Sequence, residues 1–412
     1  MKPNNFSIFK RTASAPYEEP GDSSPDPSGK KARFFNKLPG SIKKKCNNIL
    51  VLSLSMLLFN CGSGTDAYKV EEIDGARFVH NLTPKWGDKP QVELEFVKQI
   101  GDVDAEEDGH YVFNRLRQIG KDGSGNFYVL DGKNFRIVKF DRNWRYLLEF
   151  GRKGQGPGEF SMFTFDMDVD KAGNVYVLDY MQRRVEIFAA SGKVSGGFKL
   201  PGKRAMYLRV LSSGNMVKKN TIDKEEDKSL LTIVNKEGKV QSRFGTVFPP
   251  QGQIEVGYIN DARLDVDGSD NIYVTFLFEN RIEKYSPQGK LLLVVDRALN
   301  YKIDHKMVKP EGIDRYYPEM TMVSQDIAVD AKGRIWNLTF TAQPEDKGSA
   351  SSWLKDHSIV HLEIFDKEGV LLGSLPTPKH VNRIRIFGDR LFLVDTYEGM
   401  CVYEYKIFTD FH

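Results

Sequence analysis

Cysteine is scarce in this sequence, which contains only Cys46, Cys61 and Cys401 among 412 residues. Three cysteines cannot form a disulfide framework, and no two of them have the close spacing of a zinc knuckle or a redox motif. Long apolar runs are lacking as well. Residues 49–59 are mainly apolar but number eleven, and at about 1.5 Å per residue they are too short for a helix to cross a hydrocarbon core of about 30 Å. A disulfide-stapled fold is excluded, and this run is not typical of a membrane span.

Net charge is also small, since 59 Lys and Arg nearly balance 56 Asp and Glu to give a formal charge of +3. This balance disfavours general nucleic-acid binding, which needs a strongly basic surface. Residues 1–60 hold 10 of the basic and 4 of the acidic residues, so the chain from Cys61 onward carries −3. We therefore expect no nucleic-acid partner.

The N-terminal segment has the pattern of an export signal. Residues 1–42 are polar and rich in Pro and Ser, which predicts a disordered leader. Lys43, Lys44 and Lys45 then precede the short apolar run, as in a secretory signal. The run ends in Leu58-Phe59-Asn60-Cys61, which resembles the lipobox of bacterial lipoproteins, although Asn60 stands where the family usually has Gly, Ala or Ser. The resemblance implies cleavage before Cys61 and acylation of its thiol. The alternatives are an uncleaved signal anchor and a chance Cys within a signal.

A short motif recurs through the rest of the chain. Residues 125–131, GNFYVLD, return at 173–179 as GNVYVLD, and weaker copies begin at positions 214, 270, 333 and 388. Each copy is followed by a second alternating run and usually by a turn that contains Gly, and a further strand precedes most copies. Four short antiparallel strands per unit of about 40 to 60 residues are typical of a β-propeller. The sequence therefore predicts an all-β fold, a six-bladed β-propeller of four-stranded antiparallel blades.

The two ends of the repeat region are predicted to meet. The sixth unit has three strands before His412, whereas residues 92–101 look like a fourth strand without partners. Docking of this N-terminal strand on the last blade would close the ring and cover exposed strand edges. We therefore expect a leader over 1–42, a signal peptide over 43–61, a linker over 62–91 and the propeller over 92–412.

The motif copies at 125 and 173, together with the linker FGRKGQGPGEF at 150–160, resemble NHL-repeat propellers and, more narrowly, the six-bladed propeller lipoproteins of Bacteroidetes. The resemblance implies the fold and a bacterial cell-envelope location, periplasmic or cell-surface, but it does not specify an activity. The glycines at 154, 156 and 158 lack the order of a phosphate-binding loop and a following helix, so we expect them to form a turn between blades.

Related propellers include enzymes, namely peptide-amidating lyases with a zinc site built mainly from His and gluconolactonase-like proteins with calcium. The His residues that could converge here are His110, His305, His357 and His380. The sequence contains neither a short-spaced His pair of the metalloprotease kind nor a Gly-x-Ser-x-Gly elbow. We expect no catalytic residues, no metal and no cofactor, with a zinc- or calcium-dependent enzyme, lyase-like or gluconolactonase-like, as the alternative.

The innermost strands of such propellers surround a central channel, so their polar residues are the candidate ligand-binding residues. Counting back from each predicted turn gives one matching set, Asp166, Arg263, Asp326 and Arg383, and a second set, Asp168, Asp265 and Arg385. Further guanidinium groups for a carboxylate or phosphate come from Arg115, Arg117 and Arg209. These charges form either a structural ion-pair ring or a channel mouth that binds a ligand.

The insertion at 300–322 contains Tyr301, His305, Tyr316 and Tyr317, which indicates either a binding loop or a loop folded onto its own blade. We expect a lipid-anchored binding module whose partner is an envelope protein or a small polar or saccharide ligand.

Overall fold

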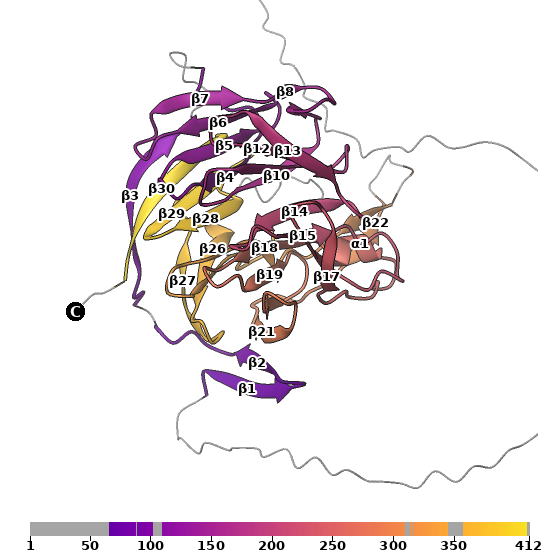
Figure 1. Cartoon of the computed structure of the whole chain (residues 1–412). Coiled ribbons are helices and arrows are strands. Elements are labelled where there is room, and N and C mark those ends of the chain that lie inside the picture. The colour runs from indigo at the N-terminus through magenta and orange to yellow at the C-terminus, as the bar shows by residue number, and fades with distance from the viewer. Residues whose placement is uncertain are drawn as a thin grey trace, which may run out of the picture. The chain divides into compact units, whose positions relative to one another are not determined.

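The computed structural model describes residues 66–87, 89–101, 109–309, 314, 316–344 and 357–409. The leader, the signal peptide and Cys61 lie outside the described residues. The described chain is built almost entirely of β-strands arranged as six four-stranded antiparallel blades, so the predicted fold class is confirmed (Figure 1). In the described ranges, no helix has both the length and the apolar character needed to cross a membrane.

Five blades consist of four consecutive strands each. Blade 1 contains β4 (Leu116–Lys121), β5 (Phe127–Asp131), β6 (Arg136–Phe140) and β7 (Tyr146–Phe150). Blade 2 contains β10 (Thr164–Val169), β11 (Val175–Asp179), β12 (Arg184–Phe188) and β13 (Val194–Lys199). Blade 3 contains β14 (Ala205–Val210), β15 (Met216–Asn220), β16 (Leu231–Val234) and β17 (Val240–Phe244). Blade 4 contains β18 (Ala262–Val266), β19 (Ile272–Phe276), β20 (Ile282–Tyr285) and β21 (Leu291–Arg297). Blade 5 contains β24 (Ser324–Val329), β25 (Ile335–Phe340), β26 (Val360–Phe365) and β27 (Leu371–Pro376).

Blade 6 joins the two ends of the described chain. It consists of β28 (Arg383–Phe387), β29 (Arg390–Asp395), β30 (Cys401–Phe408) and the N-terminal strand β3 (Glu93–Ile100), which pairs antiparallel with β30. Figure 1 shows the purple β3 beside the yellow β30. The predicted closure by an N-terminal strand is therefore confirmed. The first strands of the six blades contact one another in ring order, and they form the innermost layer.

Short elements lie between the blades. These are β8 (Arg152–Lys153) with β9 (Glu159–Phe160), β22 (Lys306–Val308) with β23 (Tyr317–Glu319), the helix α1 (Val256–Ile259) and a 3-10 turn at His357–Ile359. The cores are formed by strand residues at alternate positions, and clusters of buried aliphatic and aromatic side chains fill the space between neighbouring blades.

In four of the six blades, the turn after the inner strand is held by an aspartate that is not among the residues predicted from the sequence. Asp122 accepts hydrogen bonds from the backbone N–H groups of Ser124 and Asn126, and its other oxygen accepts one from the Tyr128 hydroxyl. Equivalent carboxylates in blades 2, 4 and 5 are Asp170, Asp267 and Asp330. Each one fixes its turn and ties the end of the first strand to the aromatic residue of the second strand.

The segment expected as a linker over 62–91 instead contains a β-hairpin, β1 (Tyr68–Ile73) and β2 (Ala76–Asn81). Asp74 and Gly75 form its two-residue loop with positive φ angles of 52° and 74°, the geometry that favours an Asp-Gly pair. Strand β2 then pairs parallel with β21 and extends blade 4 to six strands. Val79 faces the core with no solvent exposure, so the hairpin is part of the folded unit.

Asn81, at the end of β2, connects blades 4 and 5. Its side-chain amide donates to the carbonyl oxygens of Asp296 and Gly369, each at 3.0 Å, and its Oδ1 accepts from the backbone N–H of Leu371 at 2.7 Å. The residue is 1% exposed. Because three backbone groups depend on one buried amide, its loss would leave them without partners.

We predict that Asn81→Ala lowers the free energy of unfolding by about 1–3 kcal/mol, because buried backbone groups lose their partners. The matched control is His80→Ala on the same strand, whose contact with Asp296 joins two side chains that are each more than one third exposed. Urea denaturation followed by circular dichroism measures both variants. Equal midpoints for the two variants would contradict a special role for Asn81.

Candidate functional site

Polar residues of the inner strands occupy two levels of the channel, which the pairing register defines. The turn level consists of the inner-strand residues that pair with the aromatic position of the repeat on the second strand. Asp168 pairs in this way with Tyr176, and Asp265 pairs with Tyr273. The start level lies two residues earlier and contains Gln118, Asp166, Tyr207, Arg263, Asp326 and Arg383. The turn level contains Asp168, Arg209, Asp265 and Arg385. The first set predicted from the sequence therefore lies at the start level, and the second set lies at the turn level.

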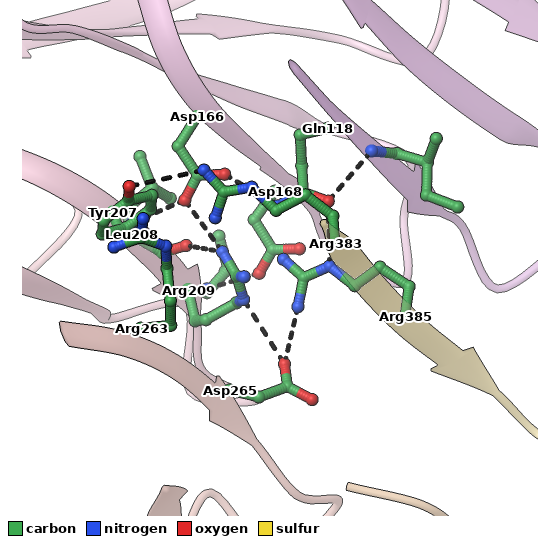
Figure 2. A network of polar contacts seen from close by, with 12 residues as sticks. Gln118, Asp166, Asp168, Tyr207, Leu208, Arg209, Arg263, Asp265, Arg383 and Arg385 are labelled. Carbon is green, nitrogen blue, oxygen red and sulfur yellow. Dashed lines mark hydrogen bonds and ion pairs between the residues drawn. The ribbon is translucent and has the colours of Figure 1, made fainter. Parts of the chain in front are cut away.

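A buried ion-pair network joins the two levels (Figure 2). Arg209 Nη1 lies 2.9 Å from an Asp166 oxygen, and Arg209 Nε lies 3.3 Å from Asp265 Oδ1. Arg385 Nη1 contacts the same Asp265 oxygen at 2.8 Å. Burial alone would lower the pKa of Arg209, but Asp166 and the neighbouring carboxylates hold it above its ordinary value. For Arg385, burial and the adjacent Arg209 together lower the pKa.

The carboxylates also bridge neighbouring blades through the backbone. Asp166 of blade 2 accepts from the N–H of Leu208 in blade 3 at 2.9 Å, and Asp168 accepts from that of Val210 at 2.8 Å. The same contact links blades 4 and 5 through Asp265 with Val329, and blades 5 and 6 through Asp326 with Ile384. These bonds satisfy backbone N–H groups on the edge of each inner strand that has no sheet partner, so the acidic residues have a structural function.

Gln118 closes this network between the first and last blades, and it is not among the residues predicted from the sequence. Its side-chain amide donates to Asp166 at 2.9 Å, and its Oε1 accepts from Arg385 Nε at 3.0 Å. It occupies the same register position as Asp166, two residues before the turn level. Counting back in blade 1 would have found it, but a neutral amide carried no charge signal.

At the start level, two guanidinium groups lie over one aromatic ring. Arg263 and Arg383 lie over Tyr207 with distances of 4.3 and 5.0 Å to the ring centre, and Arg383 Nη2 donates to the Tyr207 hydroxyl at 3.3 Å. Asp261 accepts from Arg263 at 2.9 Å. Lys219, which is 3% exposed, pairs with Tyr207 across the sheet. Sequence reasoning missed Tyr207, Lys219 and Asp261 as site residues, because one is neutral and two lie outside the counted positions.

A β-bulge re-aims Arg117. The first strands of blades 1, 2, 3 and 5 each have a register shift at the same place, which inserts one extra residue in each strand: Arg117, Phe165, Met206 and Gln325. Such a bulge changes the direction of the side chain. The Arg117 guanidinium lies 5.0 Å from the Phe165 ring centre. Arg115, in contrast, lies just before β4, is exposed, and belongs to neither the start level nor the turn level.

A pocket of about 540 Å³ lies at the turn level, where the inner strands end. Its polar lining includes Asp168, Arg209, Asp265 and Arg385, and apolar residues from the strand ends complete the wall: Val169, Val210, Val266, Val329, Ile386 and Phe387. In the part of the chain that the structure describes, Arg385 Nη2 is buried without a hydrogen-bond partner. Burial raises the pKa of Asp168. The pocket therefore offers a buried donor beside carboxylate acceptors, together with an apolar wall.

The histidines lie in separate places. His110 stacks on Tyr146 with 3.6 Å between ring centres, His305 contacts the Phe278 carbonyl at 3.2 Å, and His380 lies 3.8 Å from Asp395. Within the described ranges, no three His, Cys, Asp or Glu side chains come together as metal ligands.

The glycine linker and the aromatic insertion are both held by local bonds. Glu159 accepts from the N–H of Gly156 at 2.8 Å, so the linker forms a turn between blades 1 and 2. In the insertion, the Tyr301 hydroxyl donates to the carbonyl oxygens of Met322 and Phe340 at 3.2 and 3.1 Å, which folds this side chain onto blade 5. Tyr316 remains 58% exposed.

Six antiparallel blades around an axial pocket define the class of protein as a six-bladed β-propeller. A family model described as a 6-bladed beta-propeller matches residues 109–312, just under half of the 412 residues. A human protein named NHL repeat-containing protein 3 is 28% identical over 79 residues, which are 18% of this chain and 22% of that protein. The chain thus spans about a fifth of this curated relative.

Two solved structures from Bacteroides share the fold. A member of the DUF4221 family from Bacteroides vulgatus matches with a TM-score of 0.51 at 10% identity, covering 77% of this chain and 99% of that chain. A protein described as exported, from Bacteroides fragilis, matches with a TM-score of 0.51 at 10% identity, covering 81% and 100%. Identities this low show the fold alone. Together these findings identify the chain as a six-bladed, NHL-like β-propeller.

We predict that Arg209→Met lowers the free energy of unfolding by about 3–5 kcal/mol, because Asp166 and Asp265 would keep buried charges without their shared partner. The control is Arg142→Met, at an exposed turn position, which should change stability little. Guanidinium denaturation of the full chain measures both. A midpoint for Arg209→Met close to that of the control would show that the network does not stabilise the ring.

Proposed function

We propose that this chain is a lipid-anchored protein of the bacterial cell envelope whose propeller binds a small, hydroxyl-rich ligand, saccharide in kind, in the axial pocket at the turn level. One observation carries the binding role: a pocket of about 540 Å³ at the end of the channel, in which a buried guanidinium nitrogen has no partner among the described residues. Volumes of this order accommodate a small ligand.

The charges of the pocket favour a neutral ligand. Asp168 and Asp265 compensate Arg209 and Arg385, and the complete lining has five acidic and four basic residues, a formal charge of −1: Asp168, Asp170, Asp265, Asp267 and Asp270 against Lys171, Arg209, Lys236 and Arg385. This near balance gives no strong preference for an anion or a cation. A hydroxyl group both donates and accepts a hydrogen bond, and it can therefore satisfy Arg385 Nη2 and a carboxylate oxygen at once. The valine wall and Phe387 supply apolar contact for the carbon face of a sugar ring.

The envelope location and the anchor are supported by the sequence. Lys43, Lys44 and Lys45, the short apolar run after them and the lipobox-like end at Cys61 form one continuous signal. Once residues before Cys61 are removed, the propeller keeps a slightly acidic balance, which suits a protein held at a membrane by lipid rather than by basic side chains.

The pocket is tested with a panel of neutral monosaccharides and oligosaccharides, titrated into the full chain in detergent. Gly268 lines the pocket, and a Cβ there would meet no atom within 4 Å, so Gly268→Trp adds bulk at the pocket without a clash at its base. We predict that it weakens saccharide binding at least about tenfold, or about 1.4 kcal/mol.

Gly196→Trp is the matched control, because Gly196 lies on the outer strand of blade 2 and also has open space at its Cβ. This variant should bind like the unmodified chain. Absence of saccharide binding throughout the panel, or an equal loss in both variants, would reject the proposed ligand class.

For the anchor, we predict that Cys61→Ala abolishes incorporation of labelled palmitate and releases the chain from the membrane fraction, because it removes the acylated thiol. Cys46→Ala, within the signal, should leave labelling unchanged. Labelling of the Cys61→Ala chain at the unmodified level would exclude this site.

A further inference from the structure

We propose that the opposite end of the channel, at the start level, binds an oxyanion, either a carboxylate or a phosphate group, between Arg117, Lys219, Arg263 and Arg383. This inference rests on the proposed binding role and deepens it, because it assigns a second ligand chemistry to the other end of the same channel. It stands on residues that differ from the lining of the turn-level pocket.

The first argument is the local charge. Arg263 and Arg383 lie over the Tyr207 ring, Lys219 is its cross-strand partner, and Arg117 is close enough to interact with Tyr207 and Arg383. The carboxylate of Asp261 pairs with Arg263 at 2.9 Å and also lies near Lys219 and Arg383. Asp166 and Asp326 also lie close enough to raise the pKa of Arg383. However, Asp166 is shared with Arg209, and both carboxylates accept from the backbone of the next blade. Cations therefore outnumber the carboxylates around this ring.

The second argument is the state of Arg117. Its Nε and Nη2 are buried, and across the described residues neither atom has a hydrogen-bond partner. Burial lowers the pKa of Arg117 to about 10, and the nearby Arg115 and Arg383 add to the effect. A buried guanidinium group that lacks hydrogen-bond acceptors is less stable than the same group in water. An oxyanion would supply the missing charge and up to two acceptors.

The third argument is that the cationic side chains are already held in place. Arg117 lies over Phe165, and its stem packs against Gly132, where an added Cβ would lie 3.0 Å from Arg117 Cγ. Arg263 and Arg383 are fixed over Tyr207. Arg263 Nε has no partner within the described part of the chain. Guanidinium groups held over aromatic rings keep their donor edges free, and little entropy remains to be lost on binding.

Two side chains at the edge of the site are partly exposed. The side chain of Arg263 is 13% exposed and that of its partner Asp261 is 27% exposed. An anion would approach from this partly exposed edge, and it would have to displace neighbouring atoms to contact Arg263 Nε and Arg117 Nε and Nη2, which are buried. Two sources offer this chemistry: a free small anion, and an acidic sugar that presents a carboxylate.

The test is calorimetric titration of the full chain in detergent at constant ionic strength with three probes, inorganic phosphate, citrate and glucuronate. We expect saturable binding of at least one probe. Arg117→Met should weaken it at least about tenfold, because a charge-assisted pair contributes about 1.4 kcal/mol or more. Arg115→Met is the matched control, since Arg115 has the same charge two residues away but is exposed; it should change affinity less than about twofold.

Folding is checked in the same samples. Arg117→Met removes a buried cation that lacks hydrogen bonds at two nitrogens. Without ligand, this variant should therefore have an unfolding midpoint equal to or higher than that of the unmodified chain. Binding of glucuronate alone supports an acidic saccharide, and binding of phosphate or citrate supports a free anion. No binding of any probe, or equal losses in the two arginine variants, overturns the inference.

The two ends can be told apart with the variant Gly268→Trp, which changes the turn-level pocket and should leave anion binding unchanged. If neutral saccharides bind and the three anions do not, only the oxyanion site is refuted. If anions bind and neutral saccharides do not, the oxyanion site stands and the ligand of the turn-level pocket is refuted. Loss of anion binding in Gly268→Trp would place the anion at the wrong end and overturn the inference.

Discussion

The ring depends on one kind of contact, the bond from a buried carboxylate on one inner strand to the backbone N–H of the next. An inner strand has a sheet partner on one side only, and its other edge faces the neighbouring blade across the channel. Asp166, Asp168, Asp265 and Asp326 satisfy N–H groups on such edges. Carboxylates in this position must carry charge to be strong acceptors, and buried charge requires counter-ions. Arg209 and Arg385 provide them.

This constraint explains why the inner strands carry charged side chains although those side chains are largely buried. Removing the charges would leave strand edges unsatisfied, while keeping the carboxylates without arginines would leave uncompensated buried anions. The network also reaches the closure of the ring. Gln118 of blade 1 touches both Asp166 of blade 2 and Arg385 of blade 6, so the blade that depends on strand β3 is linked to the first two. Blade 6 therefore closes the ring twice, at its outer edge through strand β3 and at the channel axis through Arg385.

The six blades and most of the inner-strand positions could be predicted from the sequence. Side chains alternate between the two faces of a strand, so the distance from a recognised turn tells which residues face the channel. The motif at 125–131 fixed the second strand of each blade, and counting back from the turn placed Asp168 and Asp265 correctly, since no irregularity intervenes. Beyond the start level, counting fails in blades 1, 2, 3 and 5, where a bulge adds one residue. In blade 1, Arg117 is the extra residue of that bulge and Arg115 precedes it, and only Arg117 joins the channel. The hairpin β1–β2 was missed for another reason, because its partner β21 is more than two hundred residues away in sequence and the pairing is parallel.

A comparison of Arg385 and Arg117 shows which end of the channel is short of negative charge. Arg385 has one nitrogen without a partner, but its other nitrogens contact Asp265 and Gln118, so its charge is compensated within the fold. Arg117 has two such nitrogens, faces Arg383, and has an aromatic ring as its described neighbour in place of a carboxylate. The first case calls for a hydrogen-bond acceptor of any charge, whereas the second calls for an anion. One ring can therefore hold a neutral group at one end and an acidic group at the other, with the buried network between them.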